Sequence, residues 1–495
     1  MSIDRPSSAE VTRRDFAKTG TAAGLGLLLS DRLPAWTGDQ AARRRRIAIV
    51  GVGSRSQMYQ NAVNQTFADR AELVACCDTN AGRLRLAQAT ARKVGREGPA
   101  LFEAAEFDRM IDATRPELII VTTPCGIHHE YICRGMERGV DVISEKAMTI
   151  DAEKCQRIID TQRRTGRNCR VTFNYRYSPP RTQVKDLLMS GVIGDVLSVD
   201  FHWMLNTHHG ADYFRRWHSQ KKMSGGLMVH KATHHFDLVN WWLSAVPVSV
   251  QAVGKREFYV PSMAKRMGLS SHHERCRTCP EKAACGFEMD LAANANLKSL
   301  YLDNEQYDGY FRDQCVFRPD IDIEDTMNVI VSYDNNVTLS YSLNAFNSWE
   351  GYVVAFNGTK GRLEHKAEEA VYLSGDGTVQ GAIKGEGTYV RIYPLRGPAY
   401  SAEVWTGVGG HGGGDSVMLG ELFGADVKPD KYLRAADQRA GAYSMLIGAA
   451  ANRAFATGQP VKIADLVHDV GYPDYPAMPT HQDRVPMPPR AMPRG

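Results

Sequence analysis

A short apolar run that leads straight into two glycines constrains the fold of this chain more than any other feature. Residues 46–50, Arg-Ile-Ala-Ile-Val, have the length and composition of a buried parallel strand. Residues 51–56 continue with Gly-Val-Gly-Ser-Arg-Ser, where the glycines permit a tight turn and let the backbone approach a pyrophosphate. The phosphates would then lie at the N-terminus of the next helix. The pattern predicts a dinucleotide site that includes Gly51, Gly53, Ser54 and Arg55.

A carboxylate at the end of the next apolar segment agrees with such a site. Residues 73–77 end at Asp78, 27 residues after Gly51, close to where an acidic residue binds the ribose hydroxyls of NAD. The Asp78 carboxylate would repel the 2′-phosphate of NADP, although Arg83 nearby would lessen that repulsion. The sequence therefore favours NAD and keeps NADP as an alternative. A purely structural role for Asp78 is the N-cap of the helix expected at 81–94.

Two further apolar segments, 118–121 and 141–144, alternate with helical patterns. This alternation predicts an α/β architecture, with an N-terminal Rossmann domain built on a doubly wound parallel sheet. The loops at the carboxyl ends of such strands gather ligand-binding residues along one edge of the sheet. From these two loops we expect Thr123, Pro124, His128, Glu145 and Lys146 at the cofactor.

The order of these motifs, Gly-x-Gly, Asp, Thr-Pro-x-x-x-His and Glu-Lys, resembles the glucose-fructose oxidoreductase, inositol dehydrogenase and rhizopine catabolism (Gfo/Idh/MocA) family. The resemblance covers nearly the whole chain after Arg46. It implies that Lys146 reaches both nicotinamide and substrate and that Glu145 lines the cofactor pocket. Ala147 stands where the family has a proline. Without the resemblance, Glu145 and Lys146 would be typical of a surface charge pair.

The C-terminal part of the chain is expected to form an α+β domain. Alternating apolar and polar residues at 197–202 and 337–344 predict strands with one buried face, in an open, largely antiparallel sheet. The resemblance implies the same sheet and a homo-oligomer that uses it for subunit contacts. We expect a signal and linker at 1–42, the Rossmann domain at 43–168, a substrate and oligomerisation domain at 169–470 with a cysteine-containing insertion at about 256–320, and a Pro-rich tail at 471–495.

Residues 225–237 resemble the family's Gly-Gly and Asp-x-Gly-x-His helix, which places the catalytic histidine at His234. His230 occupies the usual aspartate position and Ala232 the usual glycine. An imidazole titrates near neutrality, so His234 suits proton exchange with a substrate hydroxyl while Lys146 polarises the oxygen. On one helix His230 and His234 would share a face, so a divalent metal with a third ligand is the alternative. The residues expected at the substrate are Asn174, Arg176, His230, Lys231 and His411.

Two loop segments are rich in the groups that bind sugars. Residues 206–218 combine hydrogen-bond donors with aromatic rings, which suit sugar hydroxyls and apolar ring faces. Residues 409–415 surround His411 with glycines and end at Asp415, which would equally serve as a helix N-cap. Both segments are expected near the substrate.

Four of the ten cysteines lie together in a polar region, with a Cys-x-x-Cys spacing followed by a third and a more distant fourth. This spacing is typical of a structural zinc site. Two disulfides in an oxidising compartment and free thiols are the alternatives. The four candidate ligands are Cys276, Cys279, Cys285 and Cys315.

The N-terminus reads as a targeting segment. Residues 12–18, Thr-Arg-Arg-Asp-Phe-Ala-Lys, precede an apolar run at 20–29 and resemble a twin-arginine signal. The motif predicts export through the twin-arginine pathway, to the periplasm or otherwise. The apolar run is too short to span a membrane, so the mature protein is expected to have no membrane span. Residues 34–37 hold no obvious cleavage site, so an uncleaved anchor is the alternative. The net charge of +4 is balanced along the chain apart from residues 43–46, which gives no support for nucleic-acid binding.

These features together predict an NAD(P)-dependent oxidoreductase whose small-molecule substrate is a sugar, glycoside or cyclitol. The substrate would lose a proton to His234 or Lys146 and a hydride to the nicotinamide. An exported enzyme cannot easily exchange soluble NADH, so a redox-neutral glycosidase with tightly held NAD, or sugar-to-sugar hydride transfer, is the alternative within catalysis. Outside catalysis, a binding or sensor protein would explain Ala147, His230 and Ala232 as signs of a degraded site.

Overall fold

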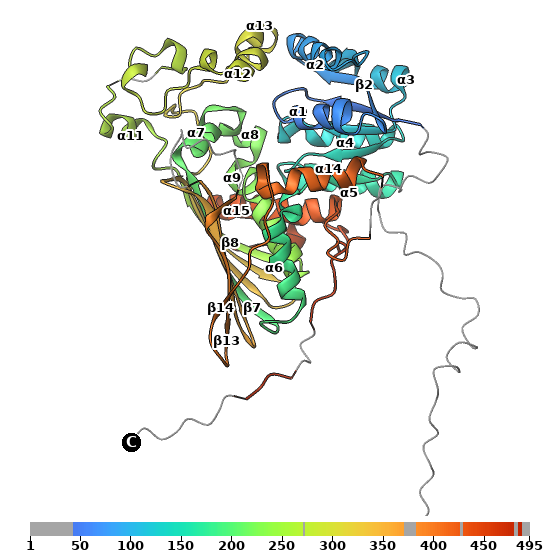
Figure 1. Cartoon of the computed structure of the whole chain (residues 1–495). Coiled ribbons are helices and arrows are strands. Elements are labelled where there is room, and N and C mark those ends of the chain that lie inside the picture. Colours follow the sequence, from blue (N-terminus) through green and yellow to red (C-terminus); the bar gives the residue numbers. More distant parts are fainter. Residues whose placement is uncertain (1–42, 271–272, 371–382, 426–428, 480–483, 488–495) are drawn as a thin grey trace, which may run out of the picture.

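The computed structural model describes residues 43–270, 273–370, 383–425, 429–479 and 484–487. This part of the chain forms two sheets, each packed with helices, and Figure 1 shows them one above the other. The predicted signal at 1–42 lies outside the described residues. Within those residues, no helix is both long and apolar enough to cross a membrane.

The first sheet is the predicted doubly wound parallel sheet. Its strand order is β15-β6-β5-β4-β1-β2-β3, and every neighbouring pair is parallel except β15 with β6. Two of its strands begin and end where the sequence predicted, at 118–121 and 141–144. The strands are β1 (Arg45–Val50), β2 (Ala71–Asp78), β3 (Ala100–Glu103), β4 (Leu118–Val121), β5 (Asp141–Ser144), β6 (Cys169–Val171) and β15 (Ala436–Asp437).

Side-chain caps mark the start of two helices in this domain. The Asn80 side chain accepts a hydrogen bond from the Arg83 backbone and caps α2, so the cap lies two residues beyond Asp78. Asp151 caps α5 in the same way through Lys154. Asp78 is therefore left for another role. The helices are α1 (Ser56–Asn61), α2 (Ala81–Lys93), α3 (Phe107–Thr114), α4 (His128–Glu137) and α5 (Ala152–Thr165).

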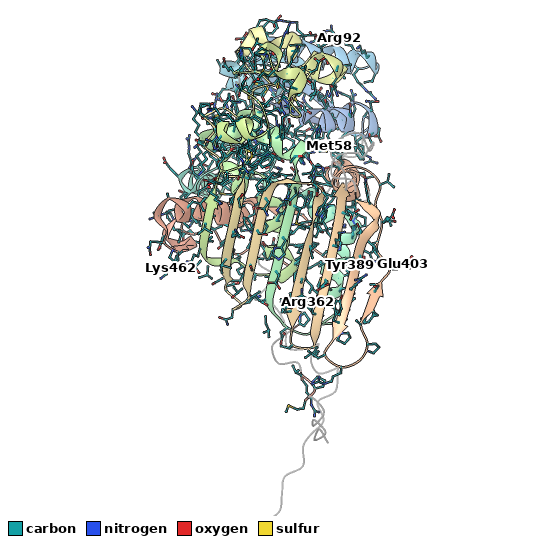
Figure 2. The ribbon with its side chains drawn as sticks, turned by 90° about the vertical axis from the view of Figure 1, so that its left-hand side faces the viewer. Met58, Arg92, Arg362, Tyr389, Glu403 and Lys462 are labelled. Atoms are coloured by element: carbon teal, nitrogen blue, oxygen red, sulfur yellow. The ribbon has the colours of Figure 1, made fainter. Side chains whose placement is uncertain are left out.

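The second sheet has nine strands in the order β14-β13-β12-β11-β7-β10-β9-β8-β16, seen side by side in Figure 2. All its pairs are antiparallel except β10 with β7, which confirms the largely antiparallel sheet. Its strands are β7 (Val196–Asn206), β8 (Pro247–Lys255), β9 (Thr326–Tyr333), β10 (Thr338–Asn347), β11 (Glu350–Gly358), β12 (Gly361–Ala370), β13 (Lys384–Pro394), β14 (Tyr400–Ala402) and β16 (Val461–Lys462).

One face of this sheet is buried under helices. In β9 the side chains of Met327, Val329 and Val331 are buried while those between them are exposed, the alternation expected of a half-covered sheet. The helix α15 packs on β8 and on α10. The homo-oligomer implied by the resemblance stays a prediction. The helices of this domain are α6 (Pro179–Met189), α7 (Thr207–Arg215), α8 (Lys221–Ser224), α9 (Gly226–His230), α10 (Thr233–Leu243), α14 (Gly414–Phe423) and α15 (Gln438–Thr457).

A long insertion between β8 and β9 reaches away from the large sheet toward the first domain. It carries three short helices, α11 (Pro261–Arg266), α12 (Ala295–Leu300) and α13 (Glu305–Asp308). Figure 1 shows α12 and α13 beside α2, far from the strands from which the insertion starts. The insertion therefore bridges the two domains.

The structure does not support the predicted zinc site in this insertion. All four cysteines are free thiols, and no three His, Cys, Asp or Glu side chains among the described residues are grouped to hold a metal. The sulfur of Cys276 lies 3.7 Å from Nη1 of Arg215, and that of Cys315 accepts a hydrogen bond from the Phe317 backbone. Free thiols, one of the three alternatives, are what the structure shows, and neither the predicted zinc site nor the disulfides find support among the described residues.

Candidate active site

A cavity of about 670 Å³ opens between the carboxyl edge of the first sheet and the helices of the second domain. This volume lies in the usual range for cofactor and ligand pockets. Residues from the ends of β1, β2, β4 and β5 line one wall, while residues from α7, α9, α10 and the insertion line the other. The predicted cofactor and substrate residues therefore line one cavity, with the exception of Arg176.

The glycine turn after β1 packs directly against the backbone of the loop after β4. Gly51 has a φ of +85°, and a Cβ there would lie 2.8 Å from the Thr123 backbone nitrogen. Asp78 fixes the turn because its Oδ2 accepts a hydrogen bond of 2.6 Å from the Val52 backbone. Gly53, Ser54, Thr123 and Pro124 also line the cavity. This cradle fits the pyrophosphate and ribose of a dinucleotide.

The expected adenosine end of the cavity carries an arginine held between two carboxylates. Nη2 of Arg83 lies 3.1 Å from Oδ1 of Asp78 and 2.6 Å from Oδ2 of Asp308. Both acids line the cavity. The sequence predicted that Arg83 would lessen the repulsion of a 2′-phosphate by Asp78, but these two negative charges already neutralise the positive charge of Arg83.

Glu145 lies at the centre of a buried hydrogen-bond network beneath the expected nicotinamide position. Its Oε1 accepts hydrogen bonds from Nε of Arg55 at 2.7 Å and from the hydroxyl of Tyr59 at 2.8 Å. Burial alone would raise the pKa of Glu145, but the charge of Arg55 holds that pKa below its usual value. Arg55 also pairs with Asp415 of the second domain at 3.6 Å. Glu145 is thus an ionised acid in the cavity wall, and a surface charge pair is excluded.

Lys146 presents an amine whose pKa is close to the physiological range. Its Nζ donates to the carbonyl oxygen of His230 at 3.1 Å and lies 3.4 Å from the Nε2 of the same residue. Burial is the largest cause that lowers the pKa of Lys146 to about 8, and the charge of Lys231 lowers it further. Half of the molecules would carry a neutral amine near that pH. Lys146 is therefore suited to exchange a proton with a substrate.

His128 joins the two loops that carry the cofactor residues. Its Nε2 lies 2.7 Å from the carbonyl oxygen of Thr123 and its Nδ1 lies 2.9 Å from that of Ala147. The side chain is almost fully buried, and burial lowers its pKa. His128 thus fixes the loops after β4 and β5 in relation to each other.

His230 and His234 lie in two different helices. The α-helix is interrupted at Lys231 and Ala232, so the prediction of one continuous helix is wrong, although both histidines line the cavity. Nε2 of His230 lies 3.1 Å from Nε2 of His218, and Nδ1 of His230 lies 3.3 Å from the sulfur of Cys125. The alternative of a metal bound by the two histidines finds no support among the described residues.

His234 is held by a stack of buried side chains. Its ring lies 4.2 Å from that of Tyr175 and nearly parallel to it, and the Arg181 guanidinium lies 3.8 Å from the centre of the Tyr175 ring. Nη2 of Arg181 donates to Oε1 of Glu369 at 2.7 Å. Burial, with the charge of Lys146, lowers the pKa of His234 well below its usual range. The imidazole is therefore neutral at physiological pH.

Glu369 contributes an oxygen without a partner. The side chain is only 2% exposed, it lines the cavity, and its Oε2 has no hydrogen-bond partner among the described residues. A buried carboxylate oxygen left unbonded is costly. A substrate hydroxyl entering the cavity would satisfy it.

The glycine-rich loop before α14 brings a further histidine to the cavity. Nδ1 of His411 lies 2.8 Å from Oδ2 of Asp415, and Nδ2 of Asn174 donates to the other oxygen at 2.6 Å. Burial would raise the pKa of Asp415, but the hydrogen bond from His411 keeps it well below its usual value. Asn174 and His411 both line the cavity, as does Lys231.

Arg176 is not among the residues that line the cavity. It is fully buried in a bidentate ion pair with Asp237, with N–O distances of 2.7 and 2.6 Å, and its guanidinium lies 5.6 Å from the ring of Tyr475 in the C-terminal tail. The prediction that Arg176 binds substrate is therefore corrected. Asn174, two residues earlier in the chain, does line the cavity. The two residues belong to one turn of 3₁₀ helix, which directs their side chains to different sides.

Several residues that complete the site escaped the sequence analysis. Residues 206–218 were expected near the substrate, and His209, Tyr213 and His218 do line the cavity. No motif pointed to the others, because each comes from a strand, helix or insertion with an ordinary polar pattern. These are Tyr59, Arg181, Tyr301, Asp308, Tyr310 and Glu369.

Comparison with known proteins agrees with this geometry. The oxidoreductase family model for an NAD-binding Rossmann fold matches residues 45–173, and the model for the C-terminal alpha/beta domain of the same family matches residues 185–463. A Bacillus subtilis (strain 168) protein named as oxidoreductase YteT is 32% identical over 434 residues, which cover 85% of this chain and 98% of that protein.

Two more distant relatives carry more specific names. A glycosyl hydrolase family 109 protein of Shewanella baltica (strain OS185) is 24% identical over 238 residues, covering 43% of this chain and 51% of that protein. The crystal structure of the WlbA dehydrogenase from Bordetella pertussis in complex with NADH and UDP-GlcNAcA is similar with a TM-score of 0.57 at 18% identity, over 85% of this chain and 99% of that one. This structural likeness shows the fold.

Proposed function

We propose a function for this chain from one premise: it belongs to the Gfo/Idh/MocA oxidoreductase family, and its N-terminal domain is an NAD-binding Rossmann domain. The protein oxidises or reduces a hydroxyl-bearing carbon of a sugar, glycoside or cyclitol with NAD(H). The observation that carries this proposal is Lys146, a lysine with a pKa near 8 in the same cavity as the dinucleotide cradle and the neutral His234. The bound nicotinamide supplies the hydride acceptor or donor.

The chain's own residues have distinct tasks in this reaction. Lys146 takes the hydroxyl proton on Nζ while the carbon-bound hydrogen leaves as hydride, and the loss of the two converts the alcohol into a carbonyl. His234 is neutral, and it offers a hydrogen bond to the same oxygen rather than a charge. Glu369 accepts a hydrogen bond from a second hydroxyl through its unpartnered Oε2. Two hydroxyls held at fixed separation would select polyols over simple alcohols.

The cofactor is proposed to be NAD rather than NADP. Asp78 and Asp308 lie on either side of Arg83, so the arginine has little charge left to attract a 2′-phosphate. Asp78 itself is at the position that binds ribose hydroxyls in domains of this kind.

A redox-neutral glycosidase is the second candidate function. The relative named as a glycosyl hydrolase family 109 protein favours it, as does the twin-arginine motif, because an exported enzyme has no pool of soluble NAD+. In this cycle a hydroxyl would be oxidised, the protonated aglycone would be eliminated, water would add to the unsaturated product, and the carbonyl would be reduced again by the hydride that the bound NADH had retained.

One assay separates these functions. The full chain with NAD+ is tested on free sugars, cyclitols and nitrophenyl glycosides, with NADH formation and nitrophenol release followed together. NADH without nitrophenol supports the dehydrogenase, and nitrophenol without net NADH supports the glycosidase. If neither product forms and product analysis finds no sugar oxidised or reduced, or if Lys146→Met equals the wild type, the proposed chemistry is wrong and a binding protein is favoured.

A further inference from the structure

We propose that residues 295–310 of the insertion, here called the strap, complete the dinucleotide site and retain NAD(H) from one turnover to the next. This inference rests on the proposed function only in taking NAD(H) as the ligand. The strap consists of α12, a 3₁₀ turn at Leu302–Asn304, and α13. It belongs to the second domain in sequence but lies against the first, as Figure 1 shows.

The strap contacts the first domain on both sides of the cradle. On the α1 side, the Ser54 backbone donates to the hydroxyl of Tyr301 at 3.2 Å, and the side-chain amides of Gln57 and Asn296 exchange hydrogen bonds of 3.0 and 3.2 Å. Ser54 belongs to the turn that approaches the pyrophosphate. The Tyr301 hydroxyl therefore lies against the turn that is expected to bind the pyrophosphate.

On the α2 side, the strap packs closely against the start of the helix. Nδ2 of Asn80 donates to the Asn304 carbonyl oxygen at 2.9 Å, in a buried position, and Arg83 pairs with Asp308. Gly82 allows this approach, because a Cβ there would lie 1.8 Å from Oδ1 of Asn304 and 2.7 Å from Cε2 of Tyr307. The glycine at this helical position is therefore explained by the strap.

The strap is also held firmly to its own domain. Arg275 of the insertion pairs with Glu305 of α13 at 2.6 and 3.1 Å and with Asp313 just beyond the strap at 2.9 Å. Tyr301, Asp308 and Tyr310 line the cavity opposite Gly53, Asp78 and Arg83.

A dinucleotide between these two walls can leave only when the strap detaches from α1 and α2. Cofactor release would then be far slower than in an open Rossmann domain. A retained cofactor must be returned to its starting oxidation state inside the site, either by the product of the first step or by a second substrate. The strap thus favours reactions that consume and regenerate the same NAD(H).

The test uses the full chain and measures cofactor exchange without any sugar. Bound NAD(H) is quantified by mass spectrometry after denaturation, and its exchange with excess isotope-labelled NAD+ gives the release rate. We expect the wild type to retain NAD(H) through gel filtration. Gly82→Ala should release it at least about tenfold faster, because the new methyl group displaces the strap while alanine favours the helix.

Gly420→Ala is the matched control. Gly420 also lies in a helix, α14, and a Cβ there meets nothing within 4 Å, so exchange should stay at the wild-type rate. If Gly82→Ala fails to fold by circular dichroism, Tyr301→Phe provides the same test through the lost hydroxyl. Rapid release from the wild type, or wild-type exchange in the strap variant, would overturn the proposal. The exchange assay contains no sugar, so it tests the strap proposal alone. A protein that retains NAD(H) but oxidises no sugar in the separate turnover assay would refute the proposed function and would not contradict the strap proposal.

Discussion

The proton-transfer role of Lys146 makes a quantitative prediction about pH. With a pKa of about 8, the free amine makes up roughly a tenth of the population at pH 7 and half at pH 8. Oxidation needs the free amine, so kcat/KM should rise about fivefold over that interval and level off above pH 9. Reduction needs the ammonium form, and its rate should fall over the same range.

Variants at this position distinguish proton transfer from simple charge. Lys146→Arg keeps a positive charge but does not release its proton in this range, so the rise with pH should disappear and kcat/KM should fall by about 10² to 10⁴. The pKa of Lys146 is also measurable without a substrate. The folded protein is acetylated at a series of pH values and then digested, and mass spectrometry gives the extent of acetylation of the peptide that contains Lys146. Acetylation with an apparent pKa near 10.5, or a flat rate profile between pH 7 and 9, would refute the assignment.

Three further variants test separate parts of the structure. Glu369→Gln should raise KM about tenfold or more, because a hydrogen bond to a charged oxygen is weakened, while NAD+ affinity measured by fluorescence titration stays unchanged. Asp308→Asn should improve NADP binding relative to NAD by about tenfold, because Arg83 loses one of its two carboxylate partners; an unaltered ratio in the same titration would contradict the neutralisation argument. Arg176→Met should lower the free energy of unfolding by about 3 kcal/mol or more, since it leaves Asp237 buried without a partner; a change in substrate affinity without loss in chemical denaturation would instead return Arg176 to the binding site.

The sequence alone determined the architecture of the first domain and half of the site. Strand length, the Gly-x-Gly turn and the carboxyl-end loops follow from local chemistry, and they identify Gly51 and Asp78, whereas the role of Lys146 comes from the resemblance to the family. The alternating pattern likewise predicted the open sheet of the second domain. These features depend on residues close together in the chain.

Only the tertiary structure decided what faces these residues. The break between α9 and α10 places His230 and His234 in two helices at one cavity, and the buried pair with Asp237 removes Arg176 from that cavity. Glu369 and the strap reach the site from distant segments with no motif of their own. Their roles depend on the long-range contacts that the packed domains form, and a local sequence pattern carries no information about which distant residue a side chain will contact.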